Sequence, residues 1–152
     1  MRLFQPPAPT RYDLHFSLAG IPVRVHPLFW LIAVLFGLSS NLIQLLIWVA
    51  VVFFSILIHE LGHALAFRRY GMSSSIVLYW GGGLTVPEAV RWGYGSANVS
   101  LSPNQEILIS LAGPFAGFML AGLVLTGVAL SGGSVLVNLL LGFMPIPSVV
   151  LP

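Results

Sequence analysis

Residues 55–67 read SILIHELGHALAF and place two histidines and a glutamate inside an apolar stretch. His59 and His63 are four residues apart, so on a helix they project from the same face, one turn apart. Two imidazole nitrogens at that separation can bind one Zn²⁺ at about 2.0–2.1 Å each. Glu60 lies on the adjacent face, where its carboxylate can take a proton from a metal-held water and later deliver it to a leaving amine. The spacing therefore predicts a zinc site capable of amide hydrolysis.

The alternative interpretation gives the same triplet a structural role near a helix end. Chance alone predicts roughly 0.002 matches to the H-E-x-x-H pattern in a chain with this few histidines and glutamates. The triplet is also flanked by SILI and ALAF, and ionisable groups inside a membrane helix indicate function by default. Metal binding is therefore the favoured interpretation.

The composition predicts an integral membrane protein. Hydrophobic residues make up 57% of the 152 residues and charged residues 7%, whereas soluble domains carry about 25% charged residues. The mean hydropathy is +0.97. The absence of cysteine excludes disulfides and thiolate chemistry, and a net charge of +2 from scattered arginines gives no nucleic-acid-binding surface.

We expect one membrane-embedded domain over 1–152, an α-helical polytopic integral membrane protein with a small β-hairpin element and about three to four transmembrane helices. Residues 42–67 are the strongest helix candidate, because 26 residues at about 1.5 Å each can cross a bilayer. The expected segments are an irregular tail (1–13), two short strands around Ala19-Gly20, a short apolar helix (28–38), the HELGH helix (42–67), an interfacial loop with a hairpin (72–105), a further helix (106–130) and the start of a last helix (134–152).

The arginines predict the orientation. If 28–38 and 42–67 both cross the membrane, all six arginines lie on one side, which the positive-inside rule makes the cytoplasm. His63 is five residues before Arg68, so the site faces the cytoplasmic side of a cell inner or plasma membrane in this interpretation.

Two further patterns predict packing and substrate contact. Gly113, Gly117 and Ala121 form a small-xxx-small ladder that predicts close approach to a neighbouring helix, the HELGH helix. Pro114 predicts a kink in the same helix. A hairpin over 76–86 with an open edge predicts pairing with an unwound substrate by strand addition.

The segment HELGHALAFRRYGM resembles the first metal-binding helix of the site-2 protease family, the intramembrane zinc metalloproteases. GGGL (81–84) is similar to the family's glycine-rich hairpin, and ILISLAGPFAGF (107–118) to its SLAGP helix. The resemblance covers about residues 14–140. It implies a Zn²⁺ endopeptidase that cuts membrane-spanning protein substrates in or near the bilayer, with His59 and His63 as metal ligands and Glu60 as the general base.

The chain departs from the family pattern at the third ligand, an aspartate in an Asn-x-x-Pro…Leu-Asp-Gly motif. The corresponding segment reads VNLLLGFMPIPSVVLP. Asn138 and either Pro145 or Pro147 resemble remnants of the motif, but Leu141 stands where a proline is expected. Residues 107–152 contain no charged residue.

The other carboxylates are weaker ligand candidates. Glu106 fits a first-turn acid favoured by the helix dipole, Glu88 a solvated loop residue, and Asp13 has no supporting context; His15 and His26 are expected at the interface rather than on a metal. We expect a chain cut short before the third ligand; the alternative is a complete protein that binds metal weakly or not at all. Two other functions stay open: a catalytically inactive membrane homologue acting as a binding or assembly protein, and a membrane zincin that uses Glu106 as ligand.

Overall fold

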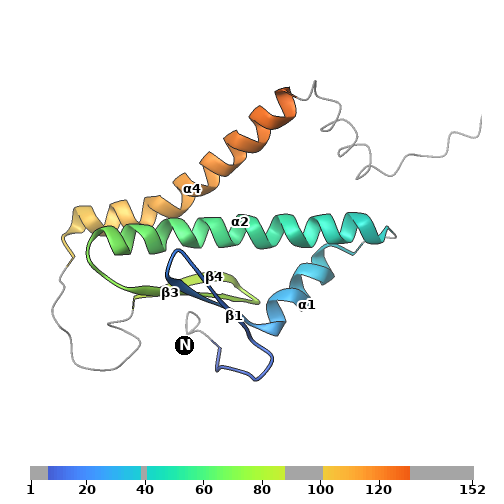
Figure 1. Ribbon diagram of the computed structural model, residues 1–152, viewed down its shortest axis with the longest axis horizontal. Coiled ribbons are helices and arrows are strands. Elements are labelled where there is room, and N and C mark those ends of the chain that lie inside the picture. The colour runs from blue at the N-terminus through green and yellow to red at the C-terminus, as the bar shows by residue number, and fades with distance from the viewer. Residues whose placement is uncertain (1–6, 39–40, 88–100, 131–152) are drawn as a thin grey trace, which may run out of the picture.

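The computed structural model describes residues 7–38, 41–87 and 101–130. It contains two long helices, one short helix and a four-stranded sheet; one long helix runs along the sheet, and the other packs against that helix on the side away from the sheet (Figure 1). In chain order the elements are β1 (Leu14–Leu18), β2 (Ile21–Val25), α1 (Pro27–Phe36), α2 (Leu42–Arg69), β3 (Ser74–Tyr79), β4 (Gly82–Pro87) and α4 (Pro103–Leu130).

The sheet joins two hairpins that are far apart in the sequence. β1 pairs with β2 and β3 pairs with β4, both antiparallel, while β2 and β3 pair in parallel. A parallel pair needs a crossover connection, and here α1 and α2 supply it. The sequence predicted each hairpin but not their union into one sheet.

The order of the strands shows which strand of the hairpin has the open edge. β3 lies between β2 and β4, so residues 76–80 belong mainly to an inner strand, whose two edges are already paired. The outer edge of the hairpin is β4, which pairs with no second strand among the described residues. Any strand addition at this hairpin must therefore use β4.

α1 begins at a histidine cap. Pro27 occupies the first turn, where its missing N–H costs nothing, and the Nδ1 atom of His26 accepts a hydrogen bond from the Leu28 N–H at 3.2 Å. The His26 N–H donates to the Leu78 carbonyl at 2.8 Å. This buried histidine is a structural cap that joins β2, α1 and β3.

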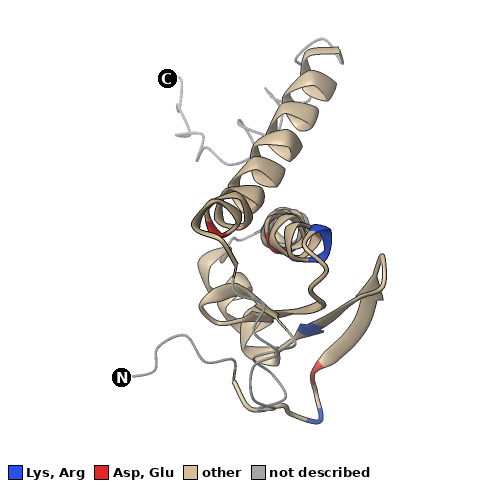
Figure 2. Cartoon of the chain, turned by 90° about the vertical axis from the view of Figure 1, so that its left-hand side faces the viewer, with Lys and Arg blue, Asp and Glu red and all other residues tan. Residues whose placement is uncertain are grey.

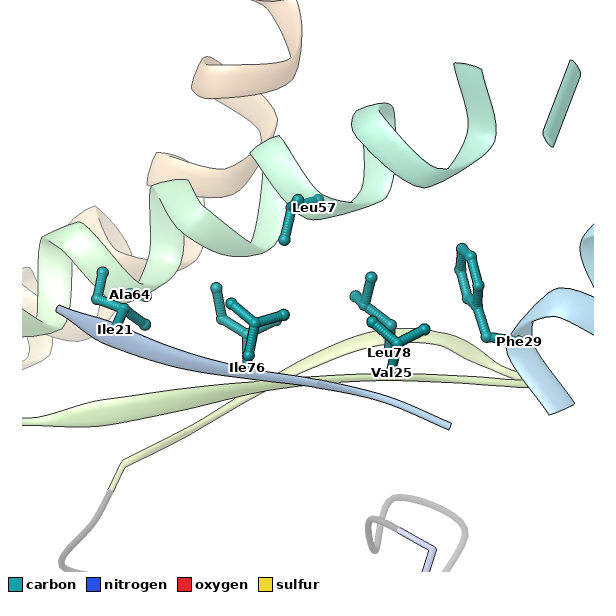
Figure 3. Close-up of a cluster of buried hydrophobic side chains, with 8 residues drawn as sticks. Ile21, Val25, Phe29, Leu57, Ala64, Ile76 and Leu78 are labelled. Atoms are coloured by element: carbon teal, nitrogen blue, oxygen red, sulfur yellow. The ribbon is translucent and has the colours of Figure 1, made fainter. Parts of the chain in front are cut away.

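The core lies between α2 and the sheet (Figure 3). Ile76 and Leu78 are two residues apart on β3, so their side chains lie on the same face, and each is fully buried. Leu57 and Ala64 face them from α2. Burying a large aliphatic side chain contributes about 1.5–3 kcal/mol, so this layer fixes α2 on the sheet at the level of the HELGH turn.

Two helices are long and apolar enough to cross a membrane, α2 and α4, within the part of the chain that the structure describes. Their most apolar windows are only 6% and 11% buried, so most of their apolar surface faces outward, as contact with lipid requires. The described charged residues lie on the sheet or in the segment just before it, in the second half of α2 and at the start of α4, and the rest of α4 is uncharged (Figure 2). The chain is thus a mostly helical membrane protein with a small sheet. The expected last helix over 134–152 lies outside the described residues.

Candidate metal centre

His59 and His63 lie one turn apart on α2, as their spacing predicts, and their rings converge. The two Nε2 atoms are 3.2 Å apart, and both residues are half-buried. Two bonds of about 2.0–2.1 Å at a tetrahedral angle would separate their nitrogens by about 3.3–3.4 Å. The pair of donors therefore fits a single zinc ion without rearrangement of α2.

A backbone carbonyl of α4 orients the His63 ring. The His63 Nδ1 atom is 2.7 Å from the Ile109 carbonyl oxygen; a carbonyl can only accept, so Nδ1 carries the proton. This tautomer leaves a lone pair on Nε2, the atom that faces His59. Metal-binding histidines are commonly held by a second hydrogen bond of this kind.

Glycines let α4 approach the histidine face of α2. A Cβ on Gly113 would lie 2.2 Å from the His63 Nε2 atom, and a Cβ on Gly62 would lie 2.4 Å from the Ala112 carbonyl oxygen. A Cβ on Gly117, in contrast, would meet no atom within 4 Å. Of the two glycines in the predicted ladder, Gly113 therefore lies against α2 and Gly117 does not. Figure 1 shows the later turns of α4 diverging from α2.

Glu60 is held from the opposite side, by the hairpin. Its side chain is buried, with 7% of the residue exposed. The Thr85 hydroxyl lies 2.7 Å from the Glu60 Oε2 atom and 3.0 Å from the Glu60 carbonyl oxygen. A Cβ on Gly83 would lie 2.3 Å from the Glu60 Cγ atom and 2.6 Å from Oε1. β4 thus fixes one carboxylate oxygen with a hydroxyl and leaves room for the other.

The remaining carboxylates do not join this centre. Asp13 accepts a hydrogen bond from Arg24 at 2.9 Å and is paired with it. Glu106 is exposed in the first turn of α4, as the helix-dipole interpretation predicts. Glu88 and Asn138 lie outside the described residues. Among the described residues no group of three or more His, Cys, Asp or Glu side chains is arranged to hold a metal.

Sequence reasoning found the three ionisable residues but missed most of their supports. Thr85 and Gly83 belong to the hairpin for which the sequence predicts substrate pairing, and Ile109 acts through its backbone carbonyl. The glycine run that begins β4 is the one feature of the sequence that could have indicated close packing of this strand against the buried Glu60 side chain.

Comparison with known proteins identifies the family of this chain. Residues 47–145 match the family model of peptidase family M50. A zinc metalloprotease of Methanocaldococcus jannaschii is 31% identical over 115 residues, which are 72% of this chain and 30% of that protein. The solved structure of a site-2 protease from M. jannaschii matches with a TM-score of 0.56 and 25% identity, over 78% of this chain and 52% of that one. The chain therefore spans about a third of the curated relative and half of the solved one. It belongs to peptidase family M50, the site-2 proteases.

Proposed function

We propose that this chain is the core of an intramembrane zinc metalloendopeptidase, with His59 and His63 as zinc ligands and Glu60 as general base. The observation that carries the proposal is the convergence of two Nε2 atoms at 3.2 Å on a helix whose neighbouring glutamate is buried. Membership of a protease family supports it. The substrates we propose are membrane-spanning proteins, cut within or near the bilayer.

The histidines would hold the ion through Nε2, and the ion would supply a polarised, more acidic water. Glu60 would be the base for such a water through Oε1, because Oε2 already accepts from Thr85. Hydrolysis would join the water oxygen to the scissile carbonyl carbon and break the C–N bond, and Glu60 would carry the proton to the leaving amide nitrogen.

Strand addition at β4 would present the substrate. Helical carbonyls are shielded by their own hydrogen bonds, so a membrane-spanning segment must unwind before it is cut. An extended segment paired along the outer edge of β4 would pass Gly83 and Thr85, the two residues that contact Glu60. The edge would then deliver the scissile bond to the carboxylate.

The orientation we propose is a multi-pass protein with its site open to the cytoplasmic side. Arg68 and Arg69 end α2, and basic residues favour the cytoplasmic face. His63 lies five residues before Arg68, so the site is roughly 8 Å from that end along the helix axis. Water can reach it at that depth.

A second function has its own supporting observation. The described residues supply two histidine donors and no third side chain arranged beside them. A membrane protein with this fold but without catalysis would act by binding or assembly.

The test is cleavage of a model membrane-spanning substrate by the purified protein in lipid. We expect cleavage by the wild type, a fall of about 10²–10⁴-fold in Glu60→Gln with zinc retained, and loss of zinc in His59→Ala. Bound zinc without cleavage in the wild type would favour the binding protein. Cleavage unchanged in Glu60→Gln would contradict the assigned base.

A further inference from the structure

An apolar cavity lies between α1, α2 and the turn of the β3–β4 hairpin. Its volume is about 170 Å³ and its walls are almost entirely apolar. α1 contributes Phe29, Ala33 and Phe36, α2 contributes Ile56, and the hairpin contributes Tyr79 and other residues at its turn. No residue of the proposed catalytic trio lines it.

The volume fits one large apolar side chain. An apolar cavity of about 150 Å³ binds benzene in another protein, so a leucine or phenylalanine side chain is the size of group this cavity can hold. The indole N–H of Trp48, another residue of the wall, already donates to the Ala33 carbonyl at 3.1 Å. The indole N–H is therefore already hydrogen-bonded and does not need a polar partner inside the cavity.

One wall of the cavity lies near Glu60. Ile56 is one turn before Glu60 on α2, a shift of about 6 Å along the axis. Gly82 lines the cavity and is followed by Gly83, which lies against Glu60. A peptide lying along β4 past Glu60 therefore continues toward Gly82 and the cavity.

The geometry points to a specificity pocket: this cavity receives an apolar side chain of the substrate about two residues from the scissile bond. The offset follows from 6 Å at about 3.3 Å per extended residue. The inference rests on the proposed function, because it assumes that Glu60 marks the bond that is cut. The substrate class it names is a segment with leucine or phenylalanine at that position.

Ala33 gives the sharpest test by cleavage. It is a small, buried residue of the wall, so Ala33→Phe fills the cavity. Substrates carrying alanine, leucine or phenylalanine at each position within three residues of the bond are compared. We expect the wild type to prefer the large residues at one position by about tenfold or more, and Ala33→Phe to lose that preference while cutting the alanine substrate.

The matched control is Leu35→Phe, on the same helix at an exposed position outside the cavity wall. It should keep the wild-type preference. Ala33→Phe that keeps the preference, or that slows all substrates equally, would overturn the inference.

A second measurement does not depend on catalysis. The chain contains no cysteine, so Ala33→Cys in the Glu60→Gln variant provides a single thiol in the cavity. Substrates with one cysteine at successive positions should form a disulfide with it at one position, about two residues from the bond. Leu35→Cys should form none. Equal yields from both variants, or no disulfide from Ala33→Cys, would overturn the inference even if the wild type cleaves. A position-specific disulfide without cleavage by the wild type would remove the proposed function and the offset from the bond, and would leave only a pocket for an apolar side chain.

Discussion

Two regions contact the same turn of α2 from different sides: β4 contacts Glu60, and α4 contacts His63. The contact with Glu60 is a side-chain hydroxyl, from Thr85, and Gly83 of the same strand lies against Glu60. The contact with His63 is a backbone carbonyl, from Ile109, and Gly113, one turn later on α4, lies against His63. Each side therefore combines a hydrogen bond with a glycine that lets the backbone come close.

The difference indicates a division of labour. The hairpin sets the position of the proposed base, whereas α4 sets the tautomer and orientation of a proposed ligand. Damage to α4 should therefore appear in zinc binding, and damage to the hairpin should appear in catalysis with zinc retained.

The largest effect on zinc is expected from Gly113→Ala. The new methyl group would lie 2.2 Å from the His63 Nε2 atom, so the ring must shift from its position beside His59. We expect zinc affinity to fall by about 10–100-fold, measured by competition with a chelator. Gly117→Ala is the matched control, because its methyl group meets no atom within 4 Å; equal losses in both variants would contradict the account.

Gly83→Ala should damage catalysis instead. Its methyl group would lie 2.3 Å from the Glu60 Cγ atom, and a misplacement of about 1 Å can cost about 10²-fold in rate. We expect kcat/KM to fall by that order while the zinc content stays at the wild-type value. Loss of zinc in this variant would break the proposed division between the two sides.

A smaller effect is expected from Thr85→Val, which keeps the shape of the side chain and removes the hydroxyl that lies 2.7 Å from Oε2. A hydrogen bond to a charged group contributes about 1.5–3 kcal/mol. We therefore expect kcat/KM to fall by about tenfold or more. Thr85→Ser should recover most of the rate. A serine variant as slow as the valine variant would show that packing, not the hydroxyl, matters.

The smallest effect is expected from Asp13→Asn, far from both regions. Burial raises the pKa of Asp13, but hydrogen bonds from Thr10 and the Arg24 guanidinium outweigh it and lower the pKa below 3.8. The folded state then binds fewer protons than the unfolded state, so the carboxylate stabilises the fold above pH 3.8 and loses this effect as the pH falls through the lowered pKa. We expect a loss of up to about 1 kcal/mol near neutral pH, measured by denaturation. The difference from wild type should shrink in acid, with no change in zinc content; a difference that grows in acid would contradict the assignment.

Local signals in the sequence were enough to predict the individual elements. The apolar run at 42–67 corresponds to α2, which ends two residues later at Arg69. The hairpin expected over 76–86 corresponds to β3 and β4. The two strands expected around Ala19-Gly20 are β1 and β2, and the turn between them has φ values of 49° at Ala19 and 78° at Gly20.

Long-range pairing was beyond the reach of the same reasoning. The parallel contact of Val23 with Ile76 joins segments about fifty residues apart, and no local pattern encodes it. For the same reason the sequence predicted His59, Glu60 and His63 as a group, because they share one helix, but not Thr85 or Ile109. Gly117 is a predicted contact that the structure does not contain. A ladder of small residues predicts contact only where the two helices stay close, and α4 has diverged from α2 at this point.

The most direct test of the central claim is zinc X-ray absorption spectroscopy on the purified protein in lipid. If one turn of α2 supplies two imidazoles to one ion, the spectrum of the wild type should contain a nitrogen shell at about 2.0–2.1 Å with imidazole scattering, and His63→Ala should lose that shell or the zinc itself. Folded protein without zinc, or a zinc shell that is the same in His59→Ala and His63→Ala as in the wild type, would contradict the account.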